Sequence, residues 1–415
     1  MNFSDFGLRF AGYSGITHLM DDLNEGLLQD GVVMLGGGNP AAIPEAIAIF
    51  EKAIEKLQAS GDLVRALANY DGPQGKTVFL ETLAEFFKEQ FGWSISSRNI
   101  ALTHGSQSSF FTLFNSFAGP SRGIKREILI PLVPEYIGYC DVGIEAGLIR
   151  SQQAKIERLQ EGYFKYQVDF EELAVDQNTG LICVSRPTNP SGNVLTDAEC
   201  HHLDKIARSN DVPLLIDNAY GTPFPNIIFN EVTPFWNDNT IVCMSLSKLG
   251  LPGARTGIVI ANEEVIQQFT NMTAIGSLAP GGIGPTIVNQ LIQENLLLPL
   301  CNEIIQPFYQ KRSQLAVRLL REAIDDPRLN IHKPEGSIFL WLWFEALTIT
   351  TDELYQRLKR QGLLIVPGKY FFPGQEENPS AHAQSCIRMN YVQSEAELRR
   401  GIEILANELR HCWGV

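Results

Sequence analysis

Long apolar runs are missing from this sequence. No stretch approaches the roughly 18 apolar residues that a membrane-spanning helix needs. The first residues, MNFSDFGLRFAGYSGI, carry Asp5 and Arg9 where an export signal would require a continuous apolar stretch. We therefore expect no membrane partner and a cytoplasmic location.

An excess of positive charge is also missing. Lysine and arginine together number 33 against 47 aspartate and glutamate residues, so the formal net charge at pH 7 is -14. Such a chain as a whole repels phosphodiester backbones and anionic lipid surfaces. We expect no nucleic-acid partner, although a few well-placed arginines could still bind a small anion.

The sequence has no C-x-x-C pair, and its seven cysteines are an odd number. Most of them lie in apolar segments, which predicts reduced and mostly buried thiols rather than a disulfide framework. Cys200, His201 and His202 are consecutive, but neighbours on a helix face different directions and no further ligand has suitable spacing. We therefore expect no metal site.

The sequence is rich instead in short β-branched runs that alternate with helix-like segments. Between about residues 50 and 295, the candidate strands are EILIPL, LICVS, PLLID, IVCMSLS and TGIVIA. This alternation is typical of an α/β fold with a mostly parallel sheet sandwiched by helices. Between two of these strands, TDAECHHLDKIARS offers Thr196 and Glu199 as a capping box, which predicts a β-α-β unit.

The last third of the chain predicts a smaller α+β domain. We expect a long helix in CNEIIQPFYQKRSQLAVRLLREAI, strands in GSIFLWLWF and CIRMNYV, and a closing helix in SEAELRRGIEILANELRHCW. A chain of this length is expected to form two or three domains. We predict a large domain over residues 51–295, a small domain over 296–415, and an N-terminal segment, 1–50, that joins the small domain.

Polar residues directly follow three of the candidate strands. RPTNPSGN follows LICVS, DNAY follows PLLI, and SLSKLGLPGAR follows IVCM. Because ligands of open α/β sheets bind at the carboxyl ends of the strands, we expect these segments to meet in one crevice. The residues that they would bring together are Asn189, Asp217, Tyr220, Lys248 and Arg255.

This set contains the groups that are needed to hold pyridoxal 5'-phosphate (PLP). A lysine forms an imine with the aldehyde of PLP, and a carboxylate stabilises the protonated pyridine nitrogen, which keeps the ring an effective electron sink. Arginine, serine hydroxyls and backbone N–H groups at a helix start would hold the phosphate. The sequence therefore predicts a PLP site around Lys248.

The three segments resemble those of the class I and II aminotransferases, which are PLP-dependent enzymes of fold type I. The resemblance extends over nearly the whole chain, through SGITHLMDDLNEGL, MLGGGNPA, NYDGPQGK, PEYIGY, SLAPGGIGP, HKPEGSIFLWLWF and RMNYV. It departs from the wider family in two places. Arg255 follows Lys248 by seven residues where eight is commoner, and NPSG replaces the more frequent NPTG.

The resemblance also implies roles for individual residues. Lys248 would hold PLP and move the substrate proton, and Asp217 would pair with the pyridine nitrogen. Arg388 would bind the substrate carboxylate, assisted by the backbone at Gly38. The other implied PLP contacts are Ser106, Gln107, Tyr136, Asn189, Tyr220, Ser245, Arg255 and, from a neighbouring subunit, Tyr70. The last of these implies a homodimer.

The reaction that the resemblance implies is transfer of an amino group from an amino acid to a 2-oxo acid. Within the family, the motifs are most similar to those of enzymes that use valine and pyruvate. Side chains that differ by a methylene or two are distinguished by only about 1–3 kcal/mol, so other amino donors stay open. A PLP-dependent carbon–sulfur lyase is a further alternative. A non-catalytic PLP-binding regulator is another, but the sequence has no basic DNA-binding segment.

Overall fold

The computed structural model describes residues 2–12, 17, 21 and 31–414 of the chain. Its larger sheet is formed by β2 (Ile100–Thr103), β3 (Gly119–Ser121), β4 (Ile124–Val133), β5 (Ile149–Gln153), β8 (Thr179–Ser185), β9 (Leu214–Asp217), β10 (Thr240–Ser245) and β11 (Gly257–Ile260). The strand order is β2-β11-β10-β9-β8-β4-β3, with β5 also paired to β4. The run from β10 through β9, β8 and β4 to β5 is parallel, whereas β11 is antiparallel to both of its neighbours.

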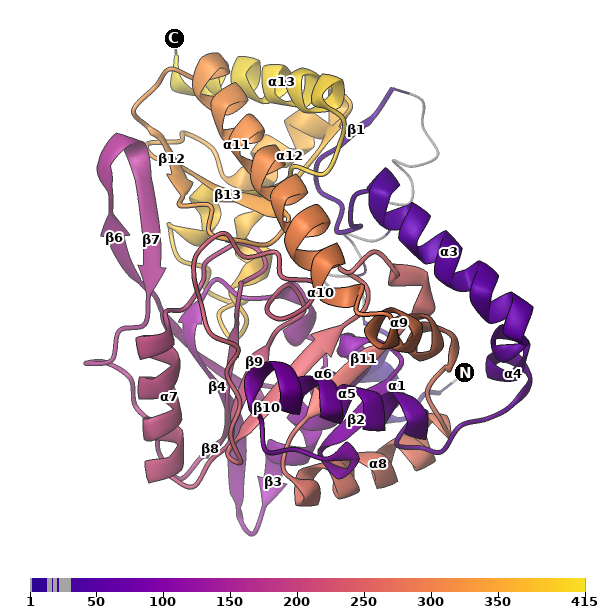
Figure 1. Ribbon diagram of the computed structural model, residues 1–415. Coiled ribbons are helices and arrows are strands. Elements are labelled where there is room, and N and C mark those ends of the chain that lie inside the picture. Colours follow the sequence, from indigo (N-terminus) through magenta and orange to yellow (C-terminus); the bar gives the residue numbers. More distant parts are fainter. Residues whose placement is uncertain (1, 13–16, 18–20, 22–30, 415) are drawn as a thin grey trace.

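Helices cover both faces of this sheet, as Figure 1 shows. One face packs against α5 (Thr77–Phe91) and α9 (Ile283–Gln293), and the other against α6 (Ser106–Phe117), α7 (Asp197–Ser209) and α8 (Glu263–Ser277). Side chains alternate along β11 as a strand requires: Ile258 and Ile260 join the first apolar cluster, and Val259 joins the second. The predicted α/β fold, with a mostly parallel sheet between helices, is confirmed.

The β-α-β unit that was expected around residue 196 forms β8, α7 and β9. Thr196 caps α7 by accepting a hydrogen bond from Glu199 N, and the Glu199 carboxylate accepts one from Thr196 N. In the parallel ladders, Ser185 at the end of β8 and Cys243 of β10 are both opposite Asp217. The carboxyl ends of three strands therefore lie side by side.

A second sheet lies beside the first and has the order β15-β16-β13-β12-β7-β6. Its strands are β6 (Lys155–Arg158), β7 (Tyr163–Gln167), β12 (Leu329–His332), β13 (Phe339–Phe344), β15 (Val366–Pro367) and β16 (Cys386–Asn390), accompanied by α11 (Gln306–Ala323), α12 (Thr351–Arg360) and α13 (Glu395–Trp413). The long helix, the two strands and the closing helix expected in this part are confirmed. β6 and β7 come from the middle of the chain, and the domain boundaries stay a prediction.

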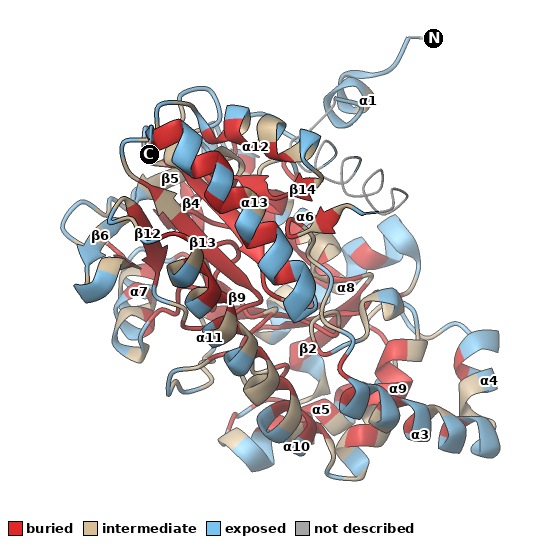
Figure 2. Cartoon of the chain, turned by 90° about the horizontal axis from the view of Figure 1, so that it is seen from above, coloured by how far each residue is buried: buried red, intermediate tan, exposed pale blue. Residues whose placement is uncertain are grey.

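The N-terminal part contributes β1 (Val33–Met34), which pairs with β14 (Leu363–Leu364), and α1 (Asp5–Phe10), α3 (Pro44–Ser60) and α4 (Asp62–Ala68). Short α10 (Leu297–Pro299) precedes a π-helical turn that leads into α11. Figure 2 shows the strands buried between helices whose outer faces are exposed. All seven cysteines are free, and only Cys140 among them is not fully buried. Within the described ranges, no helix combines the length and apolarity that crossing a bilayer requires.

Candidate active site

A cavity of about 220 Å³ lies at the carboxyl ends of β8, β9 and β10. Ser185, Asp217 and Ser245, the last residues of these strands, all line it. The sequence-predicted site residues that line it are Gly38, Ser106, Gln107, Tyr136, Asn189, Asp217, Tyr220, Ser245, Lys248, Arg255 and Arg388. The structure therefore brings together every predicted site residue except Tyr70.

Lys248 lies in the turn after β10, with its amine in the cavity. Its Nζ donates a hydrogen bond to Gly38 O at 2.5 Å and lies 5.3 Å from the centre of the Tyr220 ring. Burial, together with the positive charges of Arg388 and Arg255, lowers the pKa of Lys248 to about 8, although the Asp217 carboxylate raises it. Near neutral pH a fraction of the amine is therefore in the neutral form, which acts as a nucleophile or base.

Asp217 ends β9 and presents its carboxylate to the same cavity. Its Oδ1 accepts a hydrogen bond from Ala219 N at 3.0 Å, and its Oδ2 accepts one from the Tyr139 hydroxyl at 2.8 Å. Burial raises the pKa of Asp217 to about 6, against the lowering effect of these two bonds and of Lys248. The group is still mostly ionised near neutral pH, as a partner for a protonated ring nitrogen must be.

Arg388 of β16 reaches the cavity from the second sheet. Its Nη1 donates to Asn189 Oδ1 at 2.8 Å and its Nη2 to Gly36 O at 2.7 Å. The guanidinium carbon lies 4.0 Å from the Phe339 ring centre and 4.9 Å from that of Phe371, so the plane is held between two rings. Burial lowers the pKa of Arg388 to about 10, which leaves it a cation at neutral pH.

The first turn of α6 closes the opposite end of the cavity. Gly105 precedes this helix with φ +89°, and a Cβ atom there would lie 2.2 Å from Arg255 Nη2. Glycine is therefore required for both the turn and the close approach of the arginine. Arg255 donates from Nη2 to His104 O at 3.3 Å, so the seven-residue spacing still brings its guanidinium to the helix start, beside Ser106.

Three further predicted contacts come from a loop, a helix and a strand end. Tyr136 precedes a short 3-10 helix, Ile137–Tyr139, and burial raises its pKa to about 12. Gln107 donates from Nε2 to Gly138 O at 2.8 Å, and Ser245 Oγ accepts from Ser247 N at 3.1 Å. These polar side chains, of which Tyr136 and Gln107 are partly buried and Ser245 is buried, all line one cavity, which is the arrangement expected of a small-ligand site.

Comparisons with known proteins agree with this geometry. The sequence profile of aminotransferase class I and II matches residues 31–405. The chain is 54% identical over 414 residues to the valine–pyruvate aminotransferase of Escherichia coli strain K12, covering 100% of this chain and 99% of that protein. The chain belongs to the class I and II aminotransferase family. The resemblance that the motifs indicated is confirmed.

Two solved aminotransferase structures have the same fold as this chain. The crystal structure of valine–pyruvate aminotransferase from Salmonella typhimurium LT2 has a TM-score of 0.90 and 53% identity, covering 96% of this chain and 100% of that one. An amino-acid aminotransferase from Psychrobacter arcticum 273-4 has a TM-score of 0.97 and 46% identity, covering 100% and 99%. The fold of this aminotransferase is thus fold type I, and enzymes of this class depend on PLP.

The residues of the cavity fit that cofactor. Arg388 Nε and Gln107 Oε1 are buried and have no hydrogen-bond partner among the described residues, although buried polar atoms are nearly always paired. Both residues line the cavity, where an anionic, oxygen-rich ligand would satisfy the arginine. The helix start at Ser106 and the cation of Arg255 provide the complementary surface for a phosphate.

Several residues of the aminotransferase cavity were not anticipated from the sequence. Phe110, Ile137, Pro187 and Ala219 line it as apolar wall, and Ser185 and Ser247 as polar wall. Tyr139, whose hydroxyl bonds Asp217, stands three residues after Tyr136 in the quoted motif PEYIGY. Ser185 ends the strand LICVS, so its place at a strand end was the signal that could have identified it.

Tyr70 lies outside the cavity of its own chain. It follows α4, and 87% of its surface is exposed. This position is unusual for a tyrosine in a soluble chain, because large aromatic side chains tend to be buried in cores or interfaces. A contact of Tyr70 with the cavity therefore requires a second copy of the chain.

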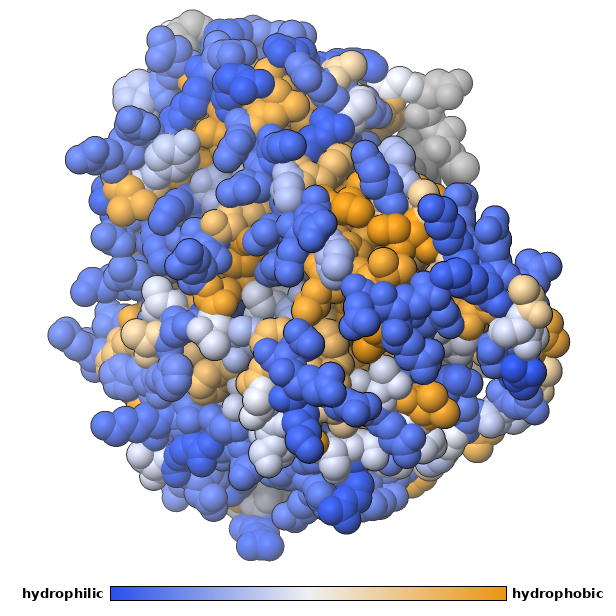
Figure 3. Space-filling model, viewed as in Figure 1, coloured by the Kyte–Doolittle hydropathy of each residue, from blue (hydrophilic) through white to orange (hydrophobic). Residues whose placement is uncertain are grey.

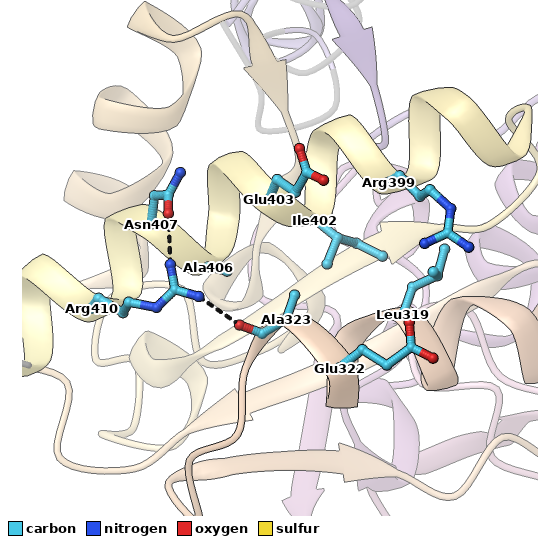
Figure 4. A pocket seen from close by; sticks show the side chains of 9 residues that line it. All are labelled: Leu319, Glu322, Ala323, Arg399, Ile402, Glu403, Ala406, Asn407 and Arg410. Carbon is cyan, nitrogen blue, oxygen red and sulfur yellow. Dashed lines mark hydrogen bonds between the residues drawn. The ribbon is translucent and has the colours of Figure 1, made fainter.

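A wider hollow between α11 and α13, about 430 Å³ in volume, has a different character (Figure 4). Arg410 donates to Asn407 Oδ1 at 2.6 Å and to Ala323 O at 2.9 Å, and Arg399 forms an ion pair with Glu395 at 2.8 Å. Its arginines are thus already paired within the protein. We place the active site at Lys248 and not in this groove.

Proposed function

We propose that this aminotransferase transfers the amino group of L-valine to pyruvate, giving 3-methyl-2-oxobutanoate and L-alanine. The choice of substrates is supported by the name of the relative that shares 54% of its sequence with the chain from end to end. The observation that carries the type of reaction is the meeting of Lys248, Asp217 and Arg388 in one buried cavity. This set supplies a nucleophilic base, a ring-nitrogen partner and a carboxylate receptor.

Lys248 has the two central roles in this proposal. Bound PLP would supply an electron sink that stabilises negative charge on the substrate Cα. Lys248 would hold the cofactor through its Nζ, and the same amine would serve as the base that takes the proton from the substrate Cα and then as the acid that returns it. A base must be neutral to accept a proton, and the pKa of about 8 leaves a usable neutral fraction near neutral pH.

Arg388 and the turn at Gly36–Gly38 would position the amino acid. Arg388 is a buried fork whose Nε has no hydrogen-bond partner among the described residues, and a fork binds a carboxylate with two parallel hydrogen bonds. Gly38 lines the cavity and bonds Lys248 through its carbonyl, so it lies between the receptor and the base. This placement would hold the Cα–H bond within reach of the Lys248 amine.

The other cavity residues would hold the two ends of PLP. Asp217 would pair with the pyridine nitrogen, Asn189 and Tyr220 would bond the ring hydroxyl, and Tyr136 would stack on the ring. The proposed phosphate contacts are Ser106, Gln107, Ser245 and Arg255. Two observations support these proposed contacts. All of these side chains line the cavity, and the start of α6 lies beside Arg255.

We also propose that the working enzyme is a homodimer in which Tyr70 reaches the phosphate of the partner's site. Apolar side chains are exposed on α3, α4 and α8 and directly after α8, namely Ile47, Val64, Leu67, Ile275 and Leu278. Apolar residues also line a hollow between α3 and the start of α11 (Figure 3). Exposed apolar patches of this kind are typical of subunit interfaces.

The direct test is to incubate the purified chain, loaded with PLP, with L-valine and pyruvate and to quantify all products. We expect alanine and 3-methyl-2-oxobutanoate in equal amounts, and no turnover when pyruvate is omitted beyond the first half-reaction. A panel of leucine, isoleucine and 2-aminobutyrate as donors defines the selectivity for valine.

Each other outcome points to a different function. Faster turnover with another amino donor would show that valine is not the preferred substrate, but the reaction would still be a transamination. Release of ammonia without alanine would support a carbon–sulfur lyase or a related elimination. Binding of PLP with no turnover of any amino acid would support a non-catalytic cofactor-binding protein.

A further inference from the structure

Glu135 is a buried carboxyl group to which the proposed reaction gives no role. It follows β4 in the motif PEYIGY and has no exposed surface. Its Oε1 accepts a hydrogen bond from Ser185 N at 2.8 Å, and its Oε2 accepts one from Tyr136 N at 3.2 Å. A fully buried carboxyl without a cationic partner needs an explanation, because burying a charge is costly.

Side chains connect Glu135 to Asp217 in an unbroken row of oxygen atoms. Glu135 Oε2 lies 2.5 Å from Ser185 Oγ, which lies 3.1 Å from the Tyr139 hydroxyl. The Tyr139 hydroxyl lies 2.8 Å from Asp217 Oδ2. Both end groups of this row are carboxyls, and both inner groups are hydroxyls.

The row contains three short contacts between oxygens, and each needs one proton to be a hydrogen bond. Ser185 and Tyr139 supply one proton each, because a hydroxyl donates only once. The third proton must therefore lie on one of the two carboxyl groups. The two carboxyl groups together then carry a single negative charge, and both hydroxyl O–H bonds point towards the carboxyl that is ionised.

The surroundings decide which carboxyl holds that proton. Asp217 faces the cavity and the amine of Lys248, and a bound pyridinium nitrogen would add a second positive neighbour. Glu135 lies deeper. Burial, together with the negative charge of Asp217, raises its pKa to about 8, although bonds from Ser185 oppose this.

Within the described part of the chain, the titratable groups that face Glu135 from the packed elements carry no positive charge. They are Tyr139 of the 3-10 helix, Cys183 of β8 and Asp217 of β9, together with its neighbour Tyr136. Each of these groups is either neutral or negative. The environment therefore favours the un-ionised acid at Glu135 and the carboxylate at Asp217.

We propose that Glu135 is an un-ionised acid behind Asp217, and that its proton orients hydrogen bonds through Ser185 and Tyr139 that keep Asp217 ionised. The benefit for the reaction rests on the proposed function, in which Asp217 pairs with the cofactor nitrogen. In that setting Glu135 is a positioning residue, since it acts through Tyr139 and touches neither substrate nor cofactor.

The test is the infrared C=O stretching band of an un-ionised carboxylic acid in the full-length protein, measured with and without PLP. At pH 7 we expect this band in the wild type, its loss in Glu135→Gln, and its persistence in Asp217→Asn. The wild-type band should disappear as the pH rises through about 8, because Glu135 then ionises. Measurement without PLP keeps the result independent of whether transamination is observed.

Glu335→Gln is the matched control. Glu335 is another buried glutamate, but it is ion-paired with Lys165 and Lys333, and the Lys165 charge contributes to a lowered pKa. Its replacement should leave the band unchanged. Absence of the band from the wild type at pH 7, or its loss in Asp217→Asn with retention in Glu135→Gln, would overturn the inference. If a variant does not fold, the pH dependence of the wild-type band still decides.

Discussion

Two partly buried lysines, Lys248 and Lys165, differ in whether a carboxylate neutralises their charge. Lys165 of β7 is paired with the buried Glu335 carboxylate and also donates to Asn193 Oδ1 at 3.2 Å and Val194 O at 3.0 Å. Lys248 makes no ion pair within the described residues and donates only to a backbone carbonyl, that of Gly38. A counter-charge keeps a buried lysine a structural cation, and its absence leaves an amine that is easily made neutral.

Among the changes that test this comparison, replacement of Lys248 is expected to have the largest effect on activity. Replacing it with methionine removes both the anchor and the base, so we expect transamination to fall by about 10⁴-fold or more. Lys165→Met is the matched variant, and its kcat in the same assay should stay within a few-fold of the wild type. Comparable turnover in Lys248→Met and the wild type would refute the role given to this amine.

Arg388 extends the comparison, because it is one of the two charges that lower the pKa of Lys248. Arg388→Lys keeps a charge but loses the planar fork, and we expect kcat/KM for valine to fall by about 100-fold, mainly through KM. Arg399→Lys, in the groove between α11 and α13, serves as the control. A KM that does not change in Arg388→Lys would remove Arg388 from substrate binding.

The ion-paired lysine of the comparison, Lys165, is expected to affect stability instead of activity. Lys165→Met leaves the buried Glu335 carboxylate with only its ion pair to Lys333, which is half exposed, so the free energy of unfolding should fall by up to about 3 kcal/mol. The double variant Lys165→Met, Glu335→Gln should recover part of that loss. Chemical denaturation of the single and double variants measures both effects. A loss in the double variant equal to the sum of the losses in Lys165→Met and Glu335→Gln would show that the two side chains act independently.

The smallest effect concerns pH. In the chain freed of PLP, the rate at which Lys248 reacts with an added aldehyde depends on its neutral fraction. With a folded-state pKa of about 8, that fraction falls about tenfold for each pH unit below 8 and reaches a plateau above it. Rates measured by absorbance, after subtraction of those of Lys248→Met, should show a midpoint near pH 8. A midpoint near 10.5, the ordinary value for lysine, would contradict the account.

The parts that could be predicted from the sequence are those with a local signal. Asp217 directly follows an apolar strand, and Lys248 and Asn189 follow one within a few residues, so strand ends and motifs were enough to place them in one crevice. Helix α7 was predicted for the same reason, since its capping box lies within four consecutive residues. These residues and this helix could be predicted because their signals lie within a few consecutive residues.

Contacts between distant segments could not be predicted in this way. Lys165 and Glu335 are 170 residues apart and meet only because β7 crosses to the second sheet beside β12. Glu135 and Asp217 are connected only because the register of β8 and β9 sets Ser185 opposite Asp217. Neither the register of β8 and β9 nor the crossing of β7 to the second sheet can be recognised from the sequences of these segments. The proposed role of Tyr70 would depend on a second copy of the chain, which a single sequence segment cannot reveal.

The most direct test of the central claim is to find which lysine carries the cofactor. The purified chain is loaded with PLP, reduced with borohydride, digested, and analysed by mass spectrometry for a pyridoxyl-phosphate adduct. The account predicts one stoichiometric adduct, on Lys248 in the peptide that contains SLSKLGLPGAR. A stoichiometric adduct on any other lysine, or none on Lys248, would contradict it.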